Sequence, residues 1–272
     1  MPRYGYATLN HSPLHGLPTQ WEAHLEAAAG AGFEAIAPDI FWLRALESEG
    51  VPLERLADAL RDHGLACMEI SGLAIGDDAR TASELEENLR YSRALSAELV
   101  NTRIVVPVDD DVVRRLRHCA VELRTKGAAA GGTGIALEFS SGSQLRSVGA
   151  TRALIEAAGV GGVGVTIDTW HFFNHVEGPD WTALEALPLE RLANLQVSDG
   201  VPHGPGQFWE ATMNQRRLPG EGSFDLARLA ALLRARGFDG AIVLEVLNAE
   251  QRARPIADYA ADSLRSAKRI FG

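Results

Sequence analysis

The sequence is short of cysteine, of positive charge and of long apolar runs, and each shortage excludes a class of protein. The 272 residues include two cysteines, too few for a disulfide framework, and both lie in apolar stretches typical of buried thiols. Lysine and arginine number 26 against 36 aspartates and glutamates, so we expect no basic surface for nucleic acid. No run reaches about 18 uncharged apolar residues, so we expect no membrane helix.

Signals for secretion and for separate domains are also missing. The first ten residues, MPRYGYATLN, show no basic region followed by an apolar run, which argues against a secretory signal. With the unpaired cysteines, this predicts a cytoplasmic protein. No tract rich in Pro, Gly or Ser separates two halves, and 46% of the residues are hydrophobic. We therefore expect residues 1–272 to form a single domain.

Short β-prone runs alternate with helical segments along the whole chain. The segments 19–32, 83–98 and 225–237 show helical periodicity. Eight strands are expected, at 4–9, 33–38, 65–71, 99–106, 134–139, 164–168, 192–198 and 240–246. Eight strands and about eight helices predict an α/β fold of the (β/α)8 TIM barrel type, which takes ~250 residues. A doubly wound open sheet has the same alternation, but the strand number and the lack of a second domain favour the barrel.

Polar side chains follow several of these strands at the point where each strand ends. They are, in chain order, Glu138, Asp168 and His171, Gln196 and Asp199, and Glu245 and Asn248. In a (β/α)8 barrel these ends meet at the active site. Three carboxylates and an amide would converge there, and like charges repel strongly in a low-dielectric pocket. A divalent cation resolves the conflict, and oxygen ligands suit Mg or Mn.

A long insertion follows the seventh predicted strand. Residues 199–222 are too long and too rich in Gly and Pro for a turn, so they predict an active-site loop. The loop offers His203, Trp209, Arg216 and Arg217 to a ligand, and Asp199 and Trp42 are further candidates for substrate binding. A purely structural alternative pairs Glu138 and Glu245 with Arg103 in buried ion pairs.

The segments LEF, IDTWH, LQVSD, RRLPGEG and VLEVLN, spread over residues 137–248, resemble the sugar phosphate isomerase/epimerase family with the xylose isomerase-like barrel. That superfamily includes ketose 3-epimerases, inosose dehydratases, 3-dehydroshikimate dehydratases and a DNA-repair nuclease. The resemblance implies metal ligands at Glu138, Asp168, Gln196 and Glu245, acid/base catalysis by the two glutamates, and substrate contacts from His171 and Arg216.

Gln196 departs from most of the family, in which ketose epimerases and inosose dehydratases have a histidine at this position of the seventh strand. A glutamine ligates through its carbonyl oxygen alone, which favours Mg or Mn over zinc. Together with LEVLN on the eighth strand, this glutamine resembles the 3-dehydroshikimate dehydratase branch. The first strand and its loop do not resemble that branch, so the substrate stays open.

The residues therefore predict an enzyme that removes the proton next to the carbonyl of a sugar-like α-hydroxy ketone, through an enediolate and with a divalent metal ion. An isomerase or epimerase is the leading hypothesis. A metal-dependent dehydratase of a cyclic, dehydroshikimate-like or inosose-like hydroxy ketone is the second, and a non-catalytic sugar-binding barrel is the third. The expected partner is a small sugar or cyclic polyol ketone, with neither nucleic acid nor membrane, and the resemblance allows a homo-oligomer.

Overall fold

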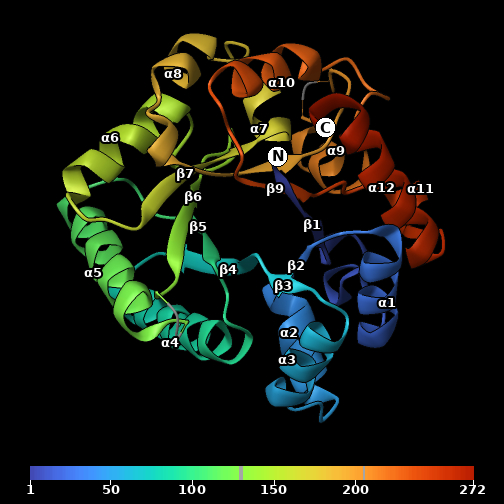
Figure 1. Ribbon diagram of the computed structural model, residues 1–272. Coiled ribbons are helices and arrows are strands. Elements are labelled where there is room, and N and C mark those ends of the chain that lie inside the picture. The colour runs from blue at the N-terminus through green and yellow to red at the C-terminus, as the bar shows by residue number, and fades with distance from the viewer. Residues whose placement is uncertain (129–130, 205) are drawn as a thin grey trace.

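A ring of parallel strands surrounded by helices forms the protein (Figure 1). The computed structural model describes residues 1–128, 131–204 and 206–272. In these residues the strands follow the order β3-β2-β1-β9-β8-β7-β6-β5-β4. Their bounds are β1 (Arg3–Ala7), β2 (Ala35–Ala37), β3 (Ala66–Cys67), β4 (Glu69–Ile75), β5 (Leu99–Ile104), β6 (Gly134–Glu138), β7 (Val163–Asp168), β8 (Leu192–Val197) and β9 (Ala241–Leu244).

The third of the eight predicted strands is split into β3 and β4, with Met68 alone between them. β3 pairs with β2, whereas β4 pairs with β5, so the two ends of the strand order belong to one stretch of chain. A bridge from Asp39 to Ser71 extends the contact beyond β2. The strands therefore form a nearly closed barrel, which confirms the (β/α)8 prediction and excludes the open sheet.

Helices cover the outside of the barrel (Figure 1). The α-helices are α1 (Trp21–Ala31), α2 (Ile40–Ser48), α3 (Leu53–Asp62), α4 (Asp78–Leu95), α5 (Asp110–Lys126), α6 (Val148–Ala158), α7 (Thr169–Phe173), α8 (Trp181–Ala186), α9 (Phe208–Asn214), α10 (Leu226–Ala235), α11 (Ala249–Arg252) and α12 (Ile256–Phe271). Short 3-10 helices are η1 (Leu9–His11), η2 (Pro13–His15) and η3 (Leu189–Arg191). None of the helices in the described residues is long and apolar enough to cross a membrane.

Side chains cap the start of several helices. α4 starts five residues before its predicted segment because the Asp77 carboxylate accepts a hydrogen bond from the backbone N–H of Arg80. The predicted loop 199–222 contains a helix, α9. Pro205 of this loop lies outside the described residues. Both cysteines are buried and free, as the sequence predicts.

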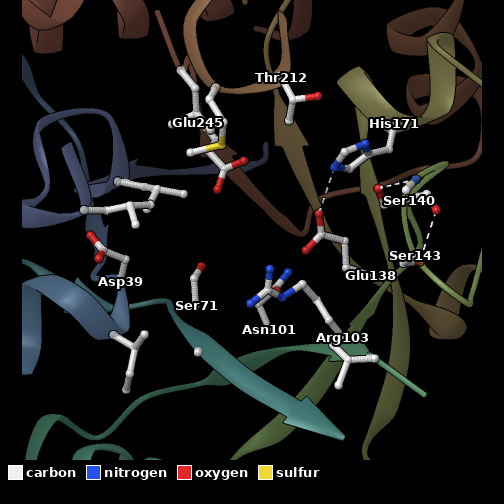
Figure 2. Close-up of a pocket in the computed structure, with 18 of the residues that line it drawn as sticks. Asp39, Ser71, Asn101, Arg103, Glu138, Ser140, Ser143, His171, Thr212 and Glu245 are labelled. Carbon is white, nitrogen blue, oxygen red and sulfur yellow. Dashed lines mark hydrogen bonds and ion pairs between the residues drawn. The ribbon is translucent and has the colours of Figure 1, made fainter. Parts of the chain in front are cut away.

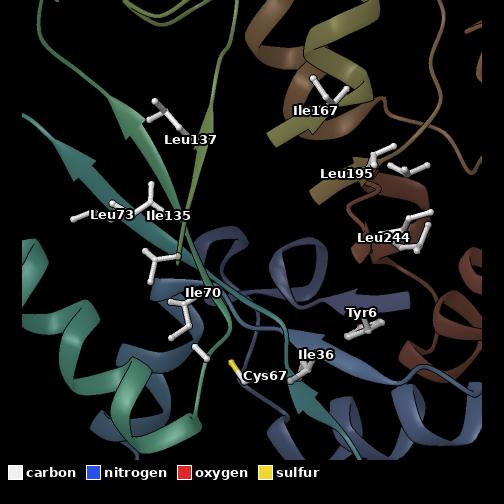
Figure 3. Packing of buried hydrophobic residues seen from close by; sticks show 14 of the residues in the cluster. Tyr6, Ile36, Cys67, Ile70, Leu73, Ile135, Leu137, Ile167, Leu195 and Leu244 are labelled. Carbon is white, nitrogen blue, oxygen red and sulfur yellow. The ribbon is translucent and has the colours of Figure 1, made fainter. Parts of the chain in front are cut away.

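Two apolar clusters pack on the two faces of the strands. The larger lies between strands and helices and includes Ile36, Leu137 and Leu244 (Figure 3). The smaller consists of Ala7, Ala35, Ala37, Met68, Ala241 and Val243. Because neighbouring residues of a strand point to opposite faces, this second set faces the barrel axis. The interior along β1, β2 and β9 is therefore apolar.

The same alternation directs polar side chains inward along β4 to β8. The aliphatic residues of these strands join the outer cluster, so the residues between them face the axis. They are Glu69 and Ser71 on β4, Asn101 and Arg103 on β5, Glu138 on β6, Thr166 and Asp168 on β7, and Asn194 and Gln196 on β8. The barrel interior is thus polar along β4 to β8, where the site lies, and apolar along β1, β2 and β9.

Gly164 of β7 has no room for a side chain, because a Cβ there would lie 2.9 Å from both the Cβ of Ala193 and the carbonyl oxygen of Arg191. We expect Gly164→Ala to lower the free energy of unfolding by about 1–3 kcal/mol. Gly149 of α6 has nothing within 4 Å of that position, so Gly149→Ala should raise the free energy of unfolding by about 0.5–1 kcal/mol. Denaturant titrations of both variants check this, and equal effects would contradict it.

Candidate active site

A cavity of about 320 Å³ opens at the carboxyl ends of the strands (Figure 2). Glu138, His171, Arg216 and Glu245 line it, which brings together all four residues predicted to be catalytic. Asp168 and Gln196 are fully buried and directly paired in the register of β7 and β8. The structure therefore places the predicted catalytic residues around one cavity.

Glu138, Asp168 and His171 form a compact cluster. The Nε2 of His171 lies 3.4 Å from Oε1 of Glu138 and 3.5 Å from Oδ2 of Asp168. Asp168 ends β7 and also caps α7, since its carboxylate accepts a hydrogen bond of 2.8 Å from the backbone N–H of Trp170. This cap starts the short helix that carries His171, so one aspartate fixes both the strand end and the imidazole.

Arg216 joins Asp168 to Glu245. Its Nη1 lies 3.1 Å from Oδ2 of Asp168 and 3.0 Å from Oε2 of Glu245, and its Nε donates to the carbonyl of Thr212. The arginine is almost fully buried. Arg103, the partner in the structural alternative, forms no ion pair with either glutamate in the described residues. That alternative is wrong about the partner of Glu245, which pairs with Arg216 from the loop after β8. The charge of Arg103 does lower the pKa of Glu138.

The environment shifts the protonation of three groups in the cavity. Burial raises the pKa of Glu138 to about 7, helped by the charge of Asp168 and opposed by Arg103 and Arg216. Burial also raises the pKa of Glu245 well above its usual range, opposed chiefly by Arg216. Burial lowers the pKa of His171 to about 4, so this imidazole is neutral near pH 7. The site combines two carboxyl groups suited to proton transfer with a neutral histidine.

Part of the predicted ligand set fits a divalent cation, whereas Glu245, the fourth predicted ligand, is paired with Arg216. Glu138, Asp168 and His171 offer ligand atoms that lie within 4.8 Å of one another. The Oε1 of Gln196 is buried and has no hydrogen-bond partner in the described residues, as expected of an atom meant for a ligand. His171 was predicted as a catalytic group rather than a ligand, and its Nε2 is placed where it could serve as either.

Trp42, Asp199 and His203, the predicted substrate-binding residues, do not line the cavity. The indole of Trp42 is fully buried and donates to the carbonyl of Thr19. His203 stacks on Trp170, with ring centroids 6.2 Å apart. The Asp199 carboxylate accepts hydrogen bonds from backbone N–H groups within its own loop. Each of the three side chains contacts the structure around the site.

Several functional residues were missed by the sequence analysis. Glu69 lies at the start of β4, fully buried, and binds the amide of Gln196. Asn101 of β5 and the exposed side chain of Phe41 line the cavity. The exposed side chain of Trp209, a loop residue that the sequence offers to a ligand, lines it too. A carboxylate within the apolar run LACMEIS was the available signal for Glu69. The strand-end rule did not find it because Glu69 begins its strand.

A family model described as xylose isomerase-like TIM barrel matches residues 25–270, and the chain belongs to this family. This confirms the resemblance inferred from the motifs. Among curated proteins, the 3-dehydroshikimate dehydratase of Pseudomonas putida (strain KT2440) is 28% identical over 250 residues, which make up 89% of this chain. The match covers 38% of that protein, so the chain spans less than half of its length.

Solved structures share the fold over nearly the whole chain. The IOLI protein with a binding zinc atom has a TM-score of 0.84 and 16% identity, covering 99% of this chain and 98% of its own. D-allulose 3-epimerase from Methylomonas sp., in complex with D-allulose, has a TM-score of 0.73 and 18% identity, covering 99% and 97%. At these identities the likeness establishes the fold alone.

Asp199 holds the loop after β8 through backbone N–H groups of Gly200, Gly220 and Phe224, at 2.8, 2.9 and 3.0 Å. We expect Asp199→Asn to lower the free energy of unfolding by about 1–3 kcal/mol, because an amide NH2 replaces one acceptor oxygen. Asp225→Asn is the matched control, since this exposed residue caps α10 and asparagine caps equally well. Chemical denaturation that finds equal stability in both variants would contradict the assignment.

Proposed function

We propose that the protein is a divalent-metal-dependent isomerase or epimerase that removes the proton next to the carbonyl of a sugar-like α-hydroxy ketone. The observation that carries this proposal is the pair Glu138 and Glu245, whose carboxyl groups enter the same cavity from different strands (Figure 2). Both have raised pKa values. Epimerisation needs one group that removes a proton from a carbon and another that returns it to the opposite face.

The other polar residues have roles that follow from their positions. Arg216 is a buried cation at the cavity wall, where it stabilises negative charge that develops on an enediolate. The neutral His171 lines the cavity, and we assign it the exchange of a proton with a substrate hydroxyl.

Glu138, Asp168, Gln196 and Glu245 are the ligands that we propose for the metal ion. When bound, the ion polarises the substrate carbonyl and makes the neighbouring C–H bond more acidic. We propose Mn or Mg because the four side chains all supply oxygen, the donor that these ions prefer. Gln196 supplies the neutral oxygen of the set.

Glu245→Gln tests the proposal. We expect bound Mn to be lost and kcat/KM to fall by about 10²- to 10⁴-fold, because a neutral amide neither binds the ion well nor accepts the proton. Glu250→Gln, an exposed neighbour on α11, is the control and should bind Mn and turn over normally. Elemental analysis, circular dichroism and steady-state kinetics measure the outcome. A folded, metal-free and fully active Glu245→Gln protein would overturn the proposal.

The reaction is identified by incubating the protein with a panel of ketoses and cyclic hydroxy ketones in deuterated water containing Mn. NMR then detects the products. An epimerase or isomerase incorporates deuterium at the carbon that exchanges its proton and forms the isomeric sugar. Tight sugar binding with neither metal nor deuterium exchange would identify the non-catalytic sugar-binding barrel instead.

A dehydratase of a cyclic hydroxy ketone that carries a carboxylate is the second candidate. It is favoured by Asn101 and Arg103, which lie on β5 beside Glu138 and line the cavity (Figure 2). The Nδ2 of Asn101 is buried and has no acceptor in the described residues. Amide and guanidinium donors on one wall suit an anionic group, which a neutral sugar lacks. The dehydratase relative, matched over 89% of this chain, supports this candidate.

Arg103→Gln separates the two candidates. For a dehydratase, we expect the KM for a carboxylate-bearing cyclic hydroxy ketone to rise about 10- to 100-fold, because a hydrogen bond to a charged group is lost. The KM for neutral ketoses should stay unchanged. The dehydration is measured by the ultraviolet absorbance of its conjugated product. An equal change for neutral and anionic substrates would argue against an anion-binding wall.

A further inference from the structure

A fully buried carboxylate, Glu69, lies inside the barrel at the start of β4. Its Oε1 accepts hydrogen bonds from the Nε2 of Gln196 at 2.7 Å and from the hydroxyl of Ser71 at 3.2 Å. Its Oε2 accepts from the Nδ2 of Asn194 at 2.5 Å. No cation pairs with Glu69 in the described residues. Burial raises the pKa of Glu69, and the hydrogen bonds from Asn194, Gln196 and Ser71 oppose this rise.

The contacts of Glu69 cross the barrel. Gln196 and Asn194 lie on β8, which is four places from β4 in the strand order. Asn194 is itself oriented, because its Oδ1 accepts a hydrogen bond of 2.9 Å from the hydroxyl of Thr166 on β7. Thr166, Asn194, Glu69 and Gln196 therefore form one network in which each amide has a defined direction.

The direction of the Gln196 amide decides what the site can hold. A glutamine binds a cation through its carbonyl oxygen, whereas its NH2 group repels one. Both carboxyl oxygens of Glu69 accept hydrogen bonds from amide NH2 groups, Oε2 from Asn194 and Oε1 from Gln196, so the NH2 end of Gln196 faces Glu69. The Oε1 is left at the other end of the amide, buried and without a partner in the described residues, and Gln196 pairs in register with Asp168.

We propose that Glu69 is a positioning residue that turns the carbonyl oxygen of Gln196 towards the ligand cluster. The inference rests on the proposed metal site and deepens it, since it explains how a glutamine replaces a histidine there. A histidine has a fixed ring and can bind through one nitrogen while the other donates. A glutamine with no acceptor behind it has two orientations, of which one opposes binding.

Glu69→Gln tests the inference by direct Mn titration of the metal-free protein, using isothermal titration calorimetry. The new amide offers both a donor and an acceptor, so it no longer selects one direction for Gln196. We expect the Kd for Mn to rise about 10- to 100-fold. Thr81→Val is the control, because it removes a buried hydrogen bond, from the backbone N–H of Gly76, that lies outside this network. Its Kd for Mn should stay within about threefold of the wild type.

Each outcome bears on a different statement. If the wild type binds no Mn or Mg, the proposed metal site fails, and the inference fails with it. If the wild type binds Mn and Glu69→Gln binds equally well, the inference alone is overturned. Equal losses in Glu69→Gln and Thr81→Val would show a general structural effect of removing a buried hydrogen bond and would also overturn the inference.

An NMR measurement covers the case in which Glu69→Gln does not fold. In the wild-type protein labelled with ¹⁵N, the side-chain amide of Gln196 should show one N–H proton protected from solvent exchange, assigned by its loss in Gln196→His. A rapidly exchanging, freely rotating Gln196 amide would contradict the bond to Glu69 and the inference.

Discussion

The structure depends on the burial of several carboxylates inside one barrel. Glu69, Glu138, Asp168 and Glu245 lie on or just beyond inward-facing strand positions, and Arg216 is the cation in direct contact with two of them. Removing a charge from water is costly unless opposite charges or hydrogen-bond donors replace the water. Each of these carboxylates therefore needs an opposite charge or a hydrogen-bond donor beside it. The side chains that meet this need make up the rest of the site.

Strand alternation is the reason that the charges converge. Residues of β4 to β8 alternate between aliphatic side chains that pack on helices and polar side chains that face the axis. The apolar residues that face the axis from β1, β2 and β9 supply packing that the polar half cannot provide. A one-residue shift of register would expose the aliphatic set to the axis and bury the carboxylates against helices, so the site also specifies the register.

The sequence was sufficient for the features that depend on local pattern. Eight strands were predictable because each is a short apolar run with its own boundaries, and Glu138, Asp168 and Gln196 were predictable because each ends or nearly ends its strand. Features that depend on how distant segments meet were not. Trp42 follows a strand as a ligand residue would, yet it faces the core from α2. Within the loop 199–222, Arg216 reaches the cavity and His203 does not, and composition does not distinguish them.

The charge of four neighbouring side chains relates protonation of the site to the proposed metal binding. Glu138, Asp168 and Glu245 carry three negative charges when ionised and Arg216 carries one positive charge, so this set carries the charge that one divalent ion would neutralise. Burial, with repulsion among these carboxylates, raises the pKa values of Glu138 and Glu245, so protons neutralise the same oxygens when no cation is bound. Two protons and one divalent cation are therefore alternative ways to neutralise one set of oxygens. A neutral residue at position 196 preserves that balance, whereas a fourth carboxylate would not, and this is why the orientation of Gln196 matters more than its charge.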